Sequence, residues 1–390
     1  MDFAILAADT ALESRMARNA RHEMLARPDH DEAARQAFVV ALKQGLNRTL
    51  RRSNDALYST LVEPDLRAAS GGKEPAREAI RDAMYALPAY RSWSALNRGA
   101  QELMWDAVGA PIRRERERLE STARDLAAKA AAGGSLDLNP DFTPPRSVTA
   151  VDIHLQPGGY ALDLGDGDIT AGALYEAGGN LYAFGQGIGR GDSKARHVQR
   201  FIASRWPGFE PRRILDLGCS AGSASVPYAL EFPDAEVHAI DVGAGMLRYA
   251  HARAEALGAA VHFHQRDCTA TGFPDGHFDL VVSHNLMHES PDSTRRGMLR
   301  ETWRLLAPGG IFVHQDVPLR FAGLPEAKKF ELSWDTRNNN EPYWEVYANA
   351  DLAADLEAAG IPAALTWVGH LPQAEGSLPW FAAAGAKPAP

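Results

Sequence analysis

The sequence has only two cysteines and no long run of apolar residues. Cys219 and Cys268 are too few for the disulfide framework of small secreted proteins, so we expect a reducing, cytoplasmic location. The apolar stretches are short and interrupted by charges, which excludes a membrane span. The first residues lack a basic start and carry Asp2 and Asp9 around their apolar run, which argues against a secretory signal. We therefore expect a cytoplasmic protein without a membrane partner.

An excess of positive charge is also missing. The chain has 41 Lys and Arg against 50 Asp and Glu, a net charge of −9. Residues 1–135 are slightly positive, so the acidic excess lies in the rest of the chain. An acidic C-terminal part is a poor electrostatic match for a polyanion, and we expect no nucleic-acid partner.

Residues 1–134 have the apolar spacing of amphipathic helices. Segments 30–50 and 77–87 repeat apolar residues at helical intervals. Segment 111–132 reads as another helix, with Pro111 at its start and two glycines, Gly133 and Gly134, as its stop. We predict an N-terminal, mainly α-helical domain over residues 1–134.

The following region, residues 135–200, is rich in glycine and aromatic residues. We expect short strands and turns there, then a helix over 197–206, and we expect the region to line the functional site.

Strand-like and helix-like segments alternate regularly after residue 210. The helix-like segments are 223–232, 243–258, 293–306 and 351–360, the third capped by Asp292 or Ser293. The strand-like segments are 213–218, 236–241, 261–267, 278–285, 311–318, 366–369 and 378–388. This alternation predicts an α/β fold, a Rossmann-like doubly wound sheet, over residues 201–390. Residues 319–350 interrupt the pattern as an insertion.

Acidic residues end three of the predicted strands. Asp216 is followed by a turn bearing Gly218 and Gly222, which places backbone amides at a helix start beside a ligand. Asp241 can hold both hydroxyls of a ribose, and Asp267 can accept from the amine of an adenine. The three strand ends meet at one edge of a parallel sheet, where such folds bind ligands. The acid before the glycines and the second acid on the third strand disfavour a nicotinamide site, whose pattern is G-x-G-x-x-G.

The segments ILDLGCSAG, VHAIDVGAGMLRYA, DCTATGFPDGHFDLVVS and LRETWRLLAPGG resemble the motifs of class I S-adenosylmethionine-dependent methyltransferases of the ubiquinone/menaquinone-biosynthesis type. The resemblance runs from Arg213 to Pro318, and Ser220 departs from it where the family usually has glycine. It implies S-adenosylmethionine as the cofactor. The residues that it implies for the cofactor site are Asp216, Gly218, Ser220, Gly222, Asp241, Val242, Met246, Asp267, Cys268 and Ser283. The side chains of Met246 and Cys268 could equally be core packing.

Transfer of a methyl group from a sulfonium depends mainly on positioning. Aromatic side chains near the cofactor can stabilise its positive charge, and Tyr175, Tyr182 and Phe184 are candidates. An oxygen or carbon acceptor usually also loses a proton, a task that suits histidine. The candidate catalytic residues are His284, His288 and His314.

The same histidines, with Glu289 and Asp316, could be ligands of zinc or iron. Histidines at this strand end are common without a metal, so we predict no metal site.

The insertion 319–350 lies where related enzymes carry part of the acceptor pocket. We expect substrate contacts from Glu289, Asp316, Trp334, Arg337, Asn338, Tyr343 and Trp344. A surface lid with its own small core is the alternative.

The expected activity is methylation of a small metabolite, with oxygen favoured over carbon or nitrogen. The alternatives are a methyltransferase of peptides or proteins and a non-catalytic cofactor-binding scaffold. The N-terminal helices could cover the acceptor or form a homodimer interface.

Overall fold

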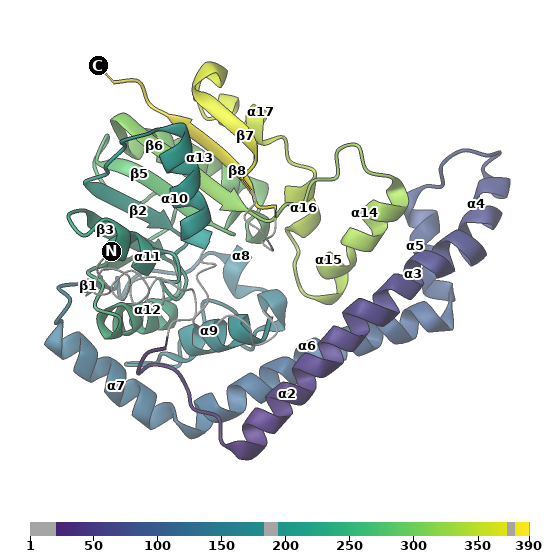
Figure 1. Cartoon of the computed structure of the whole chain (residues 1–390), viewed down its shortest axis with the longest axis horizontal. Helices are drawn as coiled ribbons and strands as arrows, with labels where there is room; N and C mark the ends of the chain where they lie inside the picture. The colour runs from purple at the N-terminus through teal and green to yellow at the C-terminus, as the bar shows by residue number, and fades with distance from the viewer. Residues whose placement is uncertain (1–20, 183–193, 373–378, 390) are drawn as a thin grey trace, which may run out of the picture.

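A twisted sheet forms the body of the protein (Figure 1). The computed structural model describes residues 21–182, 194–372 and 379–389. Within these residues the sheet has eight strands in the order β1-β4-β3-β2-β5-β6-β8-β7. Pairing is parallel from β1 to β6, and antiparallel between β6 and β8 and between β8 and β7. The strands are β1 (Ser135–Asp137), β2 (Arg213–Leu217), β3 (Glu236–Asp241), β4 (His262–Gln265), β5 (Phe278–His284), β6 (Leu306–Asp316), β7 (Thr366–His370) and β8 (Phe381–Ala386).

Helices cover both faces of this sheet, which confirms the predicted Rossmann-like α/β fold. Successive residues of a strand point to opposite faces, so Ile214 packs in one core and Leu215 in the other. The first core includes residues of α10 (Lys194–Arg205), α11 (Ser225–Glu231) and α12 (Ala244–Ala256). The second includes residues of α13 (Asp292–Leu305) and α17 (Leu352–Ala358). All seven strands predicted after residue 210 are present.

One detail of this region differs from expectation. Pro291 is the N-cap of α13, and neither Asp292 nor Ser293 caps it. Asp292 is already helical, and its carboxylate pairs with Arg295 at 2.6 Å.

The N-terminal helices form a long arm beside the sheet (Figure 1). The helical run from residue 30 to 69 lies against α6, and both extend away from the sheet. The arm consists of α2 (His30–Gly45), η1 (Leu46–Leu50), α3 (Arg51–Leu57), η2 (Tyr58–Val62), α4 (Glu63–Ala69), α5 (Arg77–Ala86) and α6 (Pro88–Arg114); α7 (Arg116–Lys129) then returns to the sheet. No helix of the described part is long and apolar enough to cross a bilayer.

Pro111 does not start a helix, contrary to the prediction. It lies inside α6, which runs on to Arg114 before α7 begins. The missing proline N–H removes one helical hydrogen bond, but burial of Val108, Pro111 and Ile112 keeps this last turn in the core.

Residues 135–182 are more helical than predicted. They form β1, α8 (Arg146–Thr149), the 3₁₀ turn η3 (Ile153–Leu155) and α9 (Thr170–Tyr182). The expectation of short strands there is therefore wrong except for β1, which joins the sheet edge beside β4. The small residues of α9 allow close packing: a Cβ on Gly172 would lie 2.3 Å from Tyr249 of α12, and one on Gly178 2.5 Å from Trp105 of α6.

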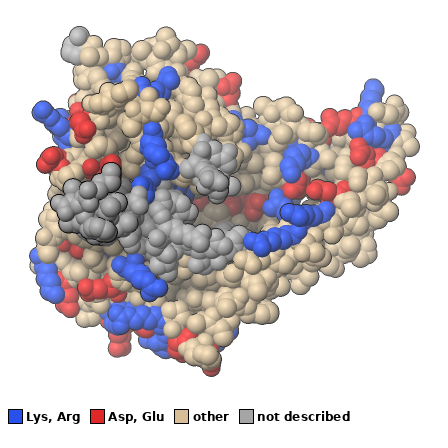
Figure 2. Space-filling model, in the orientation of Figure 1, with Lys and Arg blue, Asp and Glu red and all other residues tan. Residues whose placement is uncertain are grey.

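The insertion after β6 is also helical, with α14 (Glu326–Leu332), α15 (Trp334–Asn338) and α16 (Trp344–Ala348). It lies between the sheet and the arm (Figure 1). The surface is hollowed between the body and the arm, with acidic atoms visible inside the hollow and basic atoms along its rim (Figure 2).

Candidate active site

The turn after β2 brings its backbone unusually close to neighbouring residues. Gly218 has φ +67° and Gly222 has φ +71°, conformations that side chains rarely adopt. A Cβ on Gly218 would lie 2.8 Å from Leu286. Ser220 has φ +46°, a left-handed conformation that is unfavourable for a residue with a Cβ.

Asp241, at the end of β3, is tied to this turn. Its Oδ2 accepts the backbone N–H of Ser220 at 2.9 Å, and its Oδ1 accepts that of Gly243 at 3.0 Å. Burial raises the pKa of Asp241 although these N–H groups oppose the shift. Each carboxylate oxygen keeps a second lone pair for a ligand hydroxyl.

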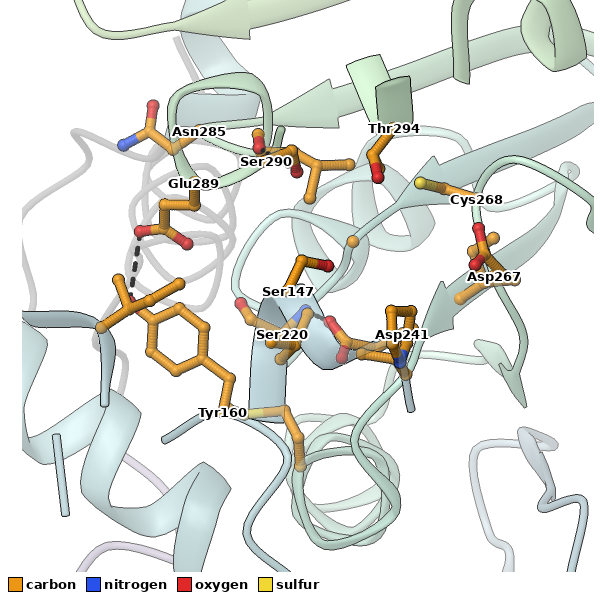
Figure 3. Close-up of a pocket in the computed structure, with 18 of the residues that line it drawn as sticks. Ser147, Tyr160, Ser220, Asp241, Asp267, Cys268, Asn285, Glu289, Ser290 and Thr294 are labelled. Carbon is orange, nitrogen blue, oxygen red and sulfur yellow. Dashed lines mark hydrogen bonds between the residues drawn. The ribbon is translucent and has the colours of Figure 1, made fainter. Parts of the chain in front are cut away.

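A cavity of about 850 Å³, partly open to solvent, lies beyond these strand ends. We call it the strand-end cavity. Figure 3 shows Asp241 and Ser220 in its middle, Asp267 and Cys268 on one side, and Glu289 and Tyr160 on the other. The predicted cofactor residues that line it are Gly218, Ser220, Asp241, Val242, Met246, Asp267 and Cys268.

The other predicted cofactor residues lie off this cavity. Asp216 lines a smaller adjoining space together with Lys194, Tyr175 and Ser220. Burial raises the pKa of Asp216 to about 7, and its Oδ2 accepts the Ser225 hydroxyl at 2.6 Å. Gly222 and Ser283 lie behind the lining, Ser283 being completely buried.

A second cavity of about 900 Å³, which includes space open to solvent, continues from the first toward the insertion. We call it the inner cavity. Three tryptophans line it: Trp105 of α6, Trp344 of α16 and Trp380. The two cavities share Tyr160, Tyr175, Asn285 and Glu289. Of the three aromatic residues proposed to lie near the cofactor, Tyr175 is therefore at the junction, whereas Phe184 and the side chain of Tyr182 lie outside the described residues.

His284 lines the strand-end cavity, but both of its ring nitrogens are engaged. Nδ1 donates to Gln315 Oε1, and Nε2 accepts from the Tyr228 hydroxyl, each at 3.1 Å. Burial lowers its pKa to about 3, so the ring is neutral near pH 7.

His314 is completely buried and lines neither cavity. Its ring lies 2.9 Å from the Ser283 hydroxyl and 3.2 Å from that of Thr302, and burial lowers its pKa to about 3. This placement joins β5, β6 and α13 within the core.

His288 and Glu289 follow β5 in the turn η4 (Met287–Glu289) and face the inner cavity. His288 Nδ1 lies 2.5 Å from Asp316 Oδ1. Burial opposes a charge on this imidazole, but Asp316 overrides it and raises the pKa of His288. Burial likewise acts against the charge on Glu289, yet the hydrogen bond with His154 keeps its pKa lowered.

The predicted substrate residues of the insertion separate into two groups. Trp334 is buried against Trp93, with its Nε1–H donating to Ser94 Oγ at 2.9 Å, and Asn338 contacts Tyr85. These two fasten the insertion to the arm, while Arg337 is exposed. Trp344 lines the inner cavity, and Tyr343 donates to the Ser147 carbonyl at 3.4 Å.

Sequence reasoning missed two polar residues that precede α9 and face Glu289. His154 Nε2 and the Tyr160 hydroxyl each lie 3.1 Å from Glu289 Oε1. Neither residue belongs to a recognisable motif. The positive φ of His154 (+56°) is visible only in the folded chain.

The strand-end cavity has the donors and acceptors that S-adenosylmethionine requires. Asp241 can accept from ribose hydroxyls, and Asp267 lies at the end where an adenine amine would be held. In the adjoining space Asp216 and Lys194 offer opposite charges to the ammonium and carboxylate of the methionine end. These residues fit the cofactor that the motifs imply.

Comparison with known proteins agrees with this fit. A profile described as a methyltransferase domain matches residues 214–310. The chain is 38% identical to a demethylmenaquinone methyltransferase of Thermus thermophilus over 28% of this chain and 48% of that protein. It is 32% identical to phosphoethanolamine N-methyltransferase 1 of Arabidopsis thaliana over 37% of this chain and 28% of that protein. These two matches thus span less than half the length of each relative.

A third relative is covered over most of its length. The chain is 31% identical to a trans-aconitate 2-methyltransferase of Deinococcus radiodurans over 48% of this chain and 72% of that protein. The three relatives are named for different acceptors, so the likeness identifies a family and not a substrate. The chain belongs to the class I S-adenosylmethionine-dependent methyltransferases.

Proposed function

We propose that this protein transfers the methyl group of S-adenosylmethionine to a small-molecule acceptor, with oxygen favoured over carbon or nitrogen. The observation that carries the proposal is the meeting of the two cavities at Tyr160, Tyr175, Asn285 and Glu289. With the cofactor in the strand-end cavity and the acceptor in the inner cavity, the reacting atoms meet at this junction. Such alignment supplies much of the acceleration in a displacement reaction.

The cofactor is oriented by charges at both of its ends. Asp241 holds the ribose, and Asp267 with the Cys268 amide holds the adenine. Asp216 and Lys194 hold the amino acid part, which leaves the sulfonium near Tyr175. An aromatic ring at that place stabilises a cation by about 0.5–2 kcal/mol.

The acceptor is a compact molecule with an aromatic or flat part. Three tryptophans provide apolar walls of the inner cavity, while Gln156, Asn339 and Glu341 provide polar contacts. The relatives named above act on demethylmenaquinone, on trans-aconitate and on phosphoethanolamine according to their names, so they support a small acceptor but do not identify one.

Oxygen is favoured because proton-accepting groups converge on the junction. In the reaction the methyl C–S bond breaks, its electron pair stays on sulfur, and a C–O bond forms. The hydroxyl proton must leave, whereas a neutral amine can attack before it loses a proton. His154, His288 and Glu289 lie at this end of the cavity and are the groups that would manage that proton. His284 and His314, whose ring nitrogens are engaged elsewhere, would hold the strand ends in place.

A methyl-donor assay against a metabolite panel, read by mass spectrometry, tests the proposal. A mass gain of one methyl group on a hydroxyl-bearing compound is expected. Glu289→Gln should lower kcat at least tenfold while leaving cofactor affinity within twofold. The matched control is Glu357→Gln, at an exposed position of α17, with wild-type turnover expected. Methylation of peptides alone, or cofactor binding without any turnover, would contradict the proposed activity.

A further inference from the structure

We propose that His154, His288 and Glu289 form a binding site for a divalent transition-metal ion of the zinc or iron(II) class. One ligand atom from each of the three lies within 4.8 Å of the others. His154 Nε2 is 3.1 Å and His288 Nε2 is 3.6 Å from Glu289 Oε1. Atoms bound to a tetrahedral zinc ion at about 2.0–2.1 Å lie about 3.3 Å apart, so this spacing is that of a ligand set. Two imidazoles and one carboxylate also suit non-haem iron(II), which keeps further positions open.

Each histidine is held through its other ring nitrogen by a buried carboxylate. His154 Nδ1 lies 2.9 Å from Glu341 Oε1, and His288 Nδ1 lies 2.5 Å from Asp316 Oδ1. A histidine that donates from Nδ1 directs the lone pair of Nε2 at its other partner, and metal-binding histidines are oriented in this way. Here Nε2 of both rings faces the same Glu289 carboxylate, so the three groups can converge on one cation.

The charge of the inner cavity also calls for a cation. Among the described residues of its lining, three are carboxylates, Glu289, Glu341 and Asp335, and one is a lysine, Lys194; Asp316 lies behind His288. In addition, Glu341 Oε2 and Gln156 Oε1 are buried and have no hydrogen-bond partner among the described residues. Buried acceptors without partners are costly, so this cavity is built to face a cation or donor groups.

The backbone at His154 is strained in a way that places the imidazole at the site. His154 and Leu155 have φ values of +56° and +60°, each costing about 1–2 kcal/mol outside glycine. The conformation is held by the His154 carbonyl, which accepts from Trp105 Nε1 at 2.7 Å and from Gln101 Nε2 at 3.0 Å. Two side chains of α6 therefore fix one ligand, while Trp344 packs edge-on against His288 at 5.4 Å.

The metal site itself is argued from the geometry alone. Its role in catalysis, described next, rests on the proposed function. The site lies in the cavity assigned to the acceptor, beside the junction with the cofactor. With an ion bound, His154, His288 and Glu289 would be its ligands and not the proton acceptors. The ion would instead bind the acceptor oxygen and lower the pKa of its hydroxyl, whose proton would pass to water. An acceptor with two neighbouring oxygen atoms would be favoured because it can bind the ion through both.

The test is metal content and cobalt spectroscopy of the full-length protein without any acceptor. Chelator-treated protein is loaded with Zn²⁺ or Co²⁺ and passed through a desalting column. We expect about one ion per chain and visible Co²⁺ absorption bands in the wild type. The variants His154→Asn and Glu289→Gln should lose both the bound ion and the absorption bands. Asparagine is chosen at position 154 because it tolerates the left-handed backbone. Glu341→Gln should weaken affinity about 10- to 100-fold, the loss expected when a group that orients a ligand is removed.

The matched control is His264→Ala. This histidine belongs to a separate group with His238 and His262 outside both cavities, so the variant should keep the ion. A wild type without metal, or equal metal content in wild type and His154→Asn, would overturn the site. Binding of S-adenosylmethionine to the chelator-treated protein is measured separately by calorimetry. Absence of binding would count against the proposed function but would not affect the metal result.

Discussion

The backbone N–H of Ser220 donates to Asp241 Oδ2 at 2.9 Å, across the gap between the glycine turn and the end of β3. This bond holds Ser220 at φ +46° and at the same time orients the carboxylate assigned to the ribose. The strain of the turn and the geometry of the cofactor site are therefore linked through two residues.

Ser220→Gly should stabilise the protein. A left-handed conformation costs a residue with a Cβ about 1–2 kcal/mol, and the greater freedom of glycine in the unfolded chain offsets part of that gain. We expect the free energy of unfolding to rise by about 0.5–1 kcal/mol, measured by urea denaturation, with cofactor affinity unchanged within twofold. Ser220→Ala retains the Cβ and serves as the control. A glycine variant no more stable than the alanine variant would refute the strain.

Asp216→Asn should change how stability depends on pH. Burial raises the pKa of Asp216 to about 7, from 3.8 for an ordinary aspartate, so the folded state binds the proton more tightly than the unfolded state. The contribution of this group to the free energy of unfolding is complete below pH 3.8. It is lost as pH rises toward 7, by about 1.4 kcal/mol per pH unit. The Tm of the asparagine variant relative to wild type should therefore rise between pH 5 and 7 in thermal scans. Parallel Tm curves would show that Asp216 does not titrate there.

Trp334→Phe and Trp344→Phe should differ in their effect on the acceptor. Trp334 donates to Ser94, and Trp344 donates to the Leu332 carbonyl at 2.8 Å, so each variant loses one hydrogen bond. Both should lower the free energy of unfolding by about 1–3 kcal/mol. Only Trp344 lines the inner cavity, so only its replacement should raise the KM of the acceptor severalfold. An equal rise in KM for Trp334→Phe would place that residue in the acceptor pocket after all.

The homodimer expected from the N-terminal helices stays a proposal, and the arm offers a way to test it. Phe38, Leu61 and Leu96 on the arm are 62%, 56% and 52% exposed. Burial of such side chains against a second copy would stabilise a dimer. Light scattering after size exclusion should give the mass of two chains for wild type and of one chain for Phe38→Glu combined with Leu61→Glu. A wild-type monomer at micromolar concentration would exclude this interface.

The strands, and the edge of the sheet at which the strand-end cavity opens, could be predicted from local patterns. Alternating strand-like and helix-like segments predicted β2 to β8, and the acids at or just beyond the ends of β2, β3 and β4 predicted the edge at which the cavity opens. These predictions succeeded because each depends on neighbours in the sequence. The short strands expected in residues 135–200 were wrong except for the three-residue β1. Pro111 was wrongly predicted to start a helix because a proline can also lie in the buried last turn of one.

The inner cavity, assigned to the acceptor, could not be predicted from local patterns in the same way. His154 meets Glu289 across 135 residues and Glu341 comes from the insertion, so no spacing indicates the group. Likewise, Trp334 and Trp344 look alike in sequence, and only packing against α6 or the inner cavity separates them. Conversely, His284 and His314 have the residue type of a catalytic base, but the folded chain engages both of their ring nitrogens.

Calorimetric titration of S-adenosylmethionine into the full-length protein and Asp241→Asn tests the central claim most directly. The wild type should bind one equivalent, and the variant should bind at least tenfold more weakly because it loses the charged acceptor of the ribose hydroxyls. Asp234→Asn, at an exposed position before β3, is the control and should bind like the wild type. A wild type that does not bind the cofactor, or an Asp241→Asn variant with unchanged affinity, would contradict the account.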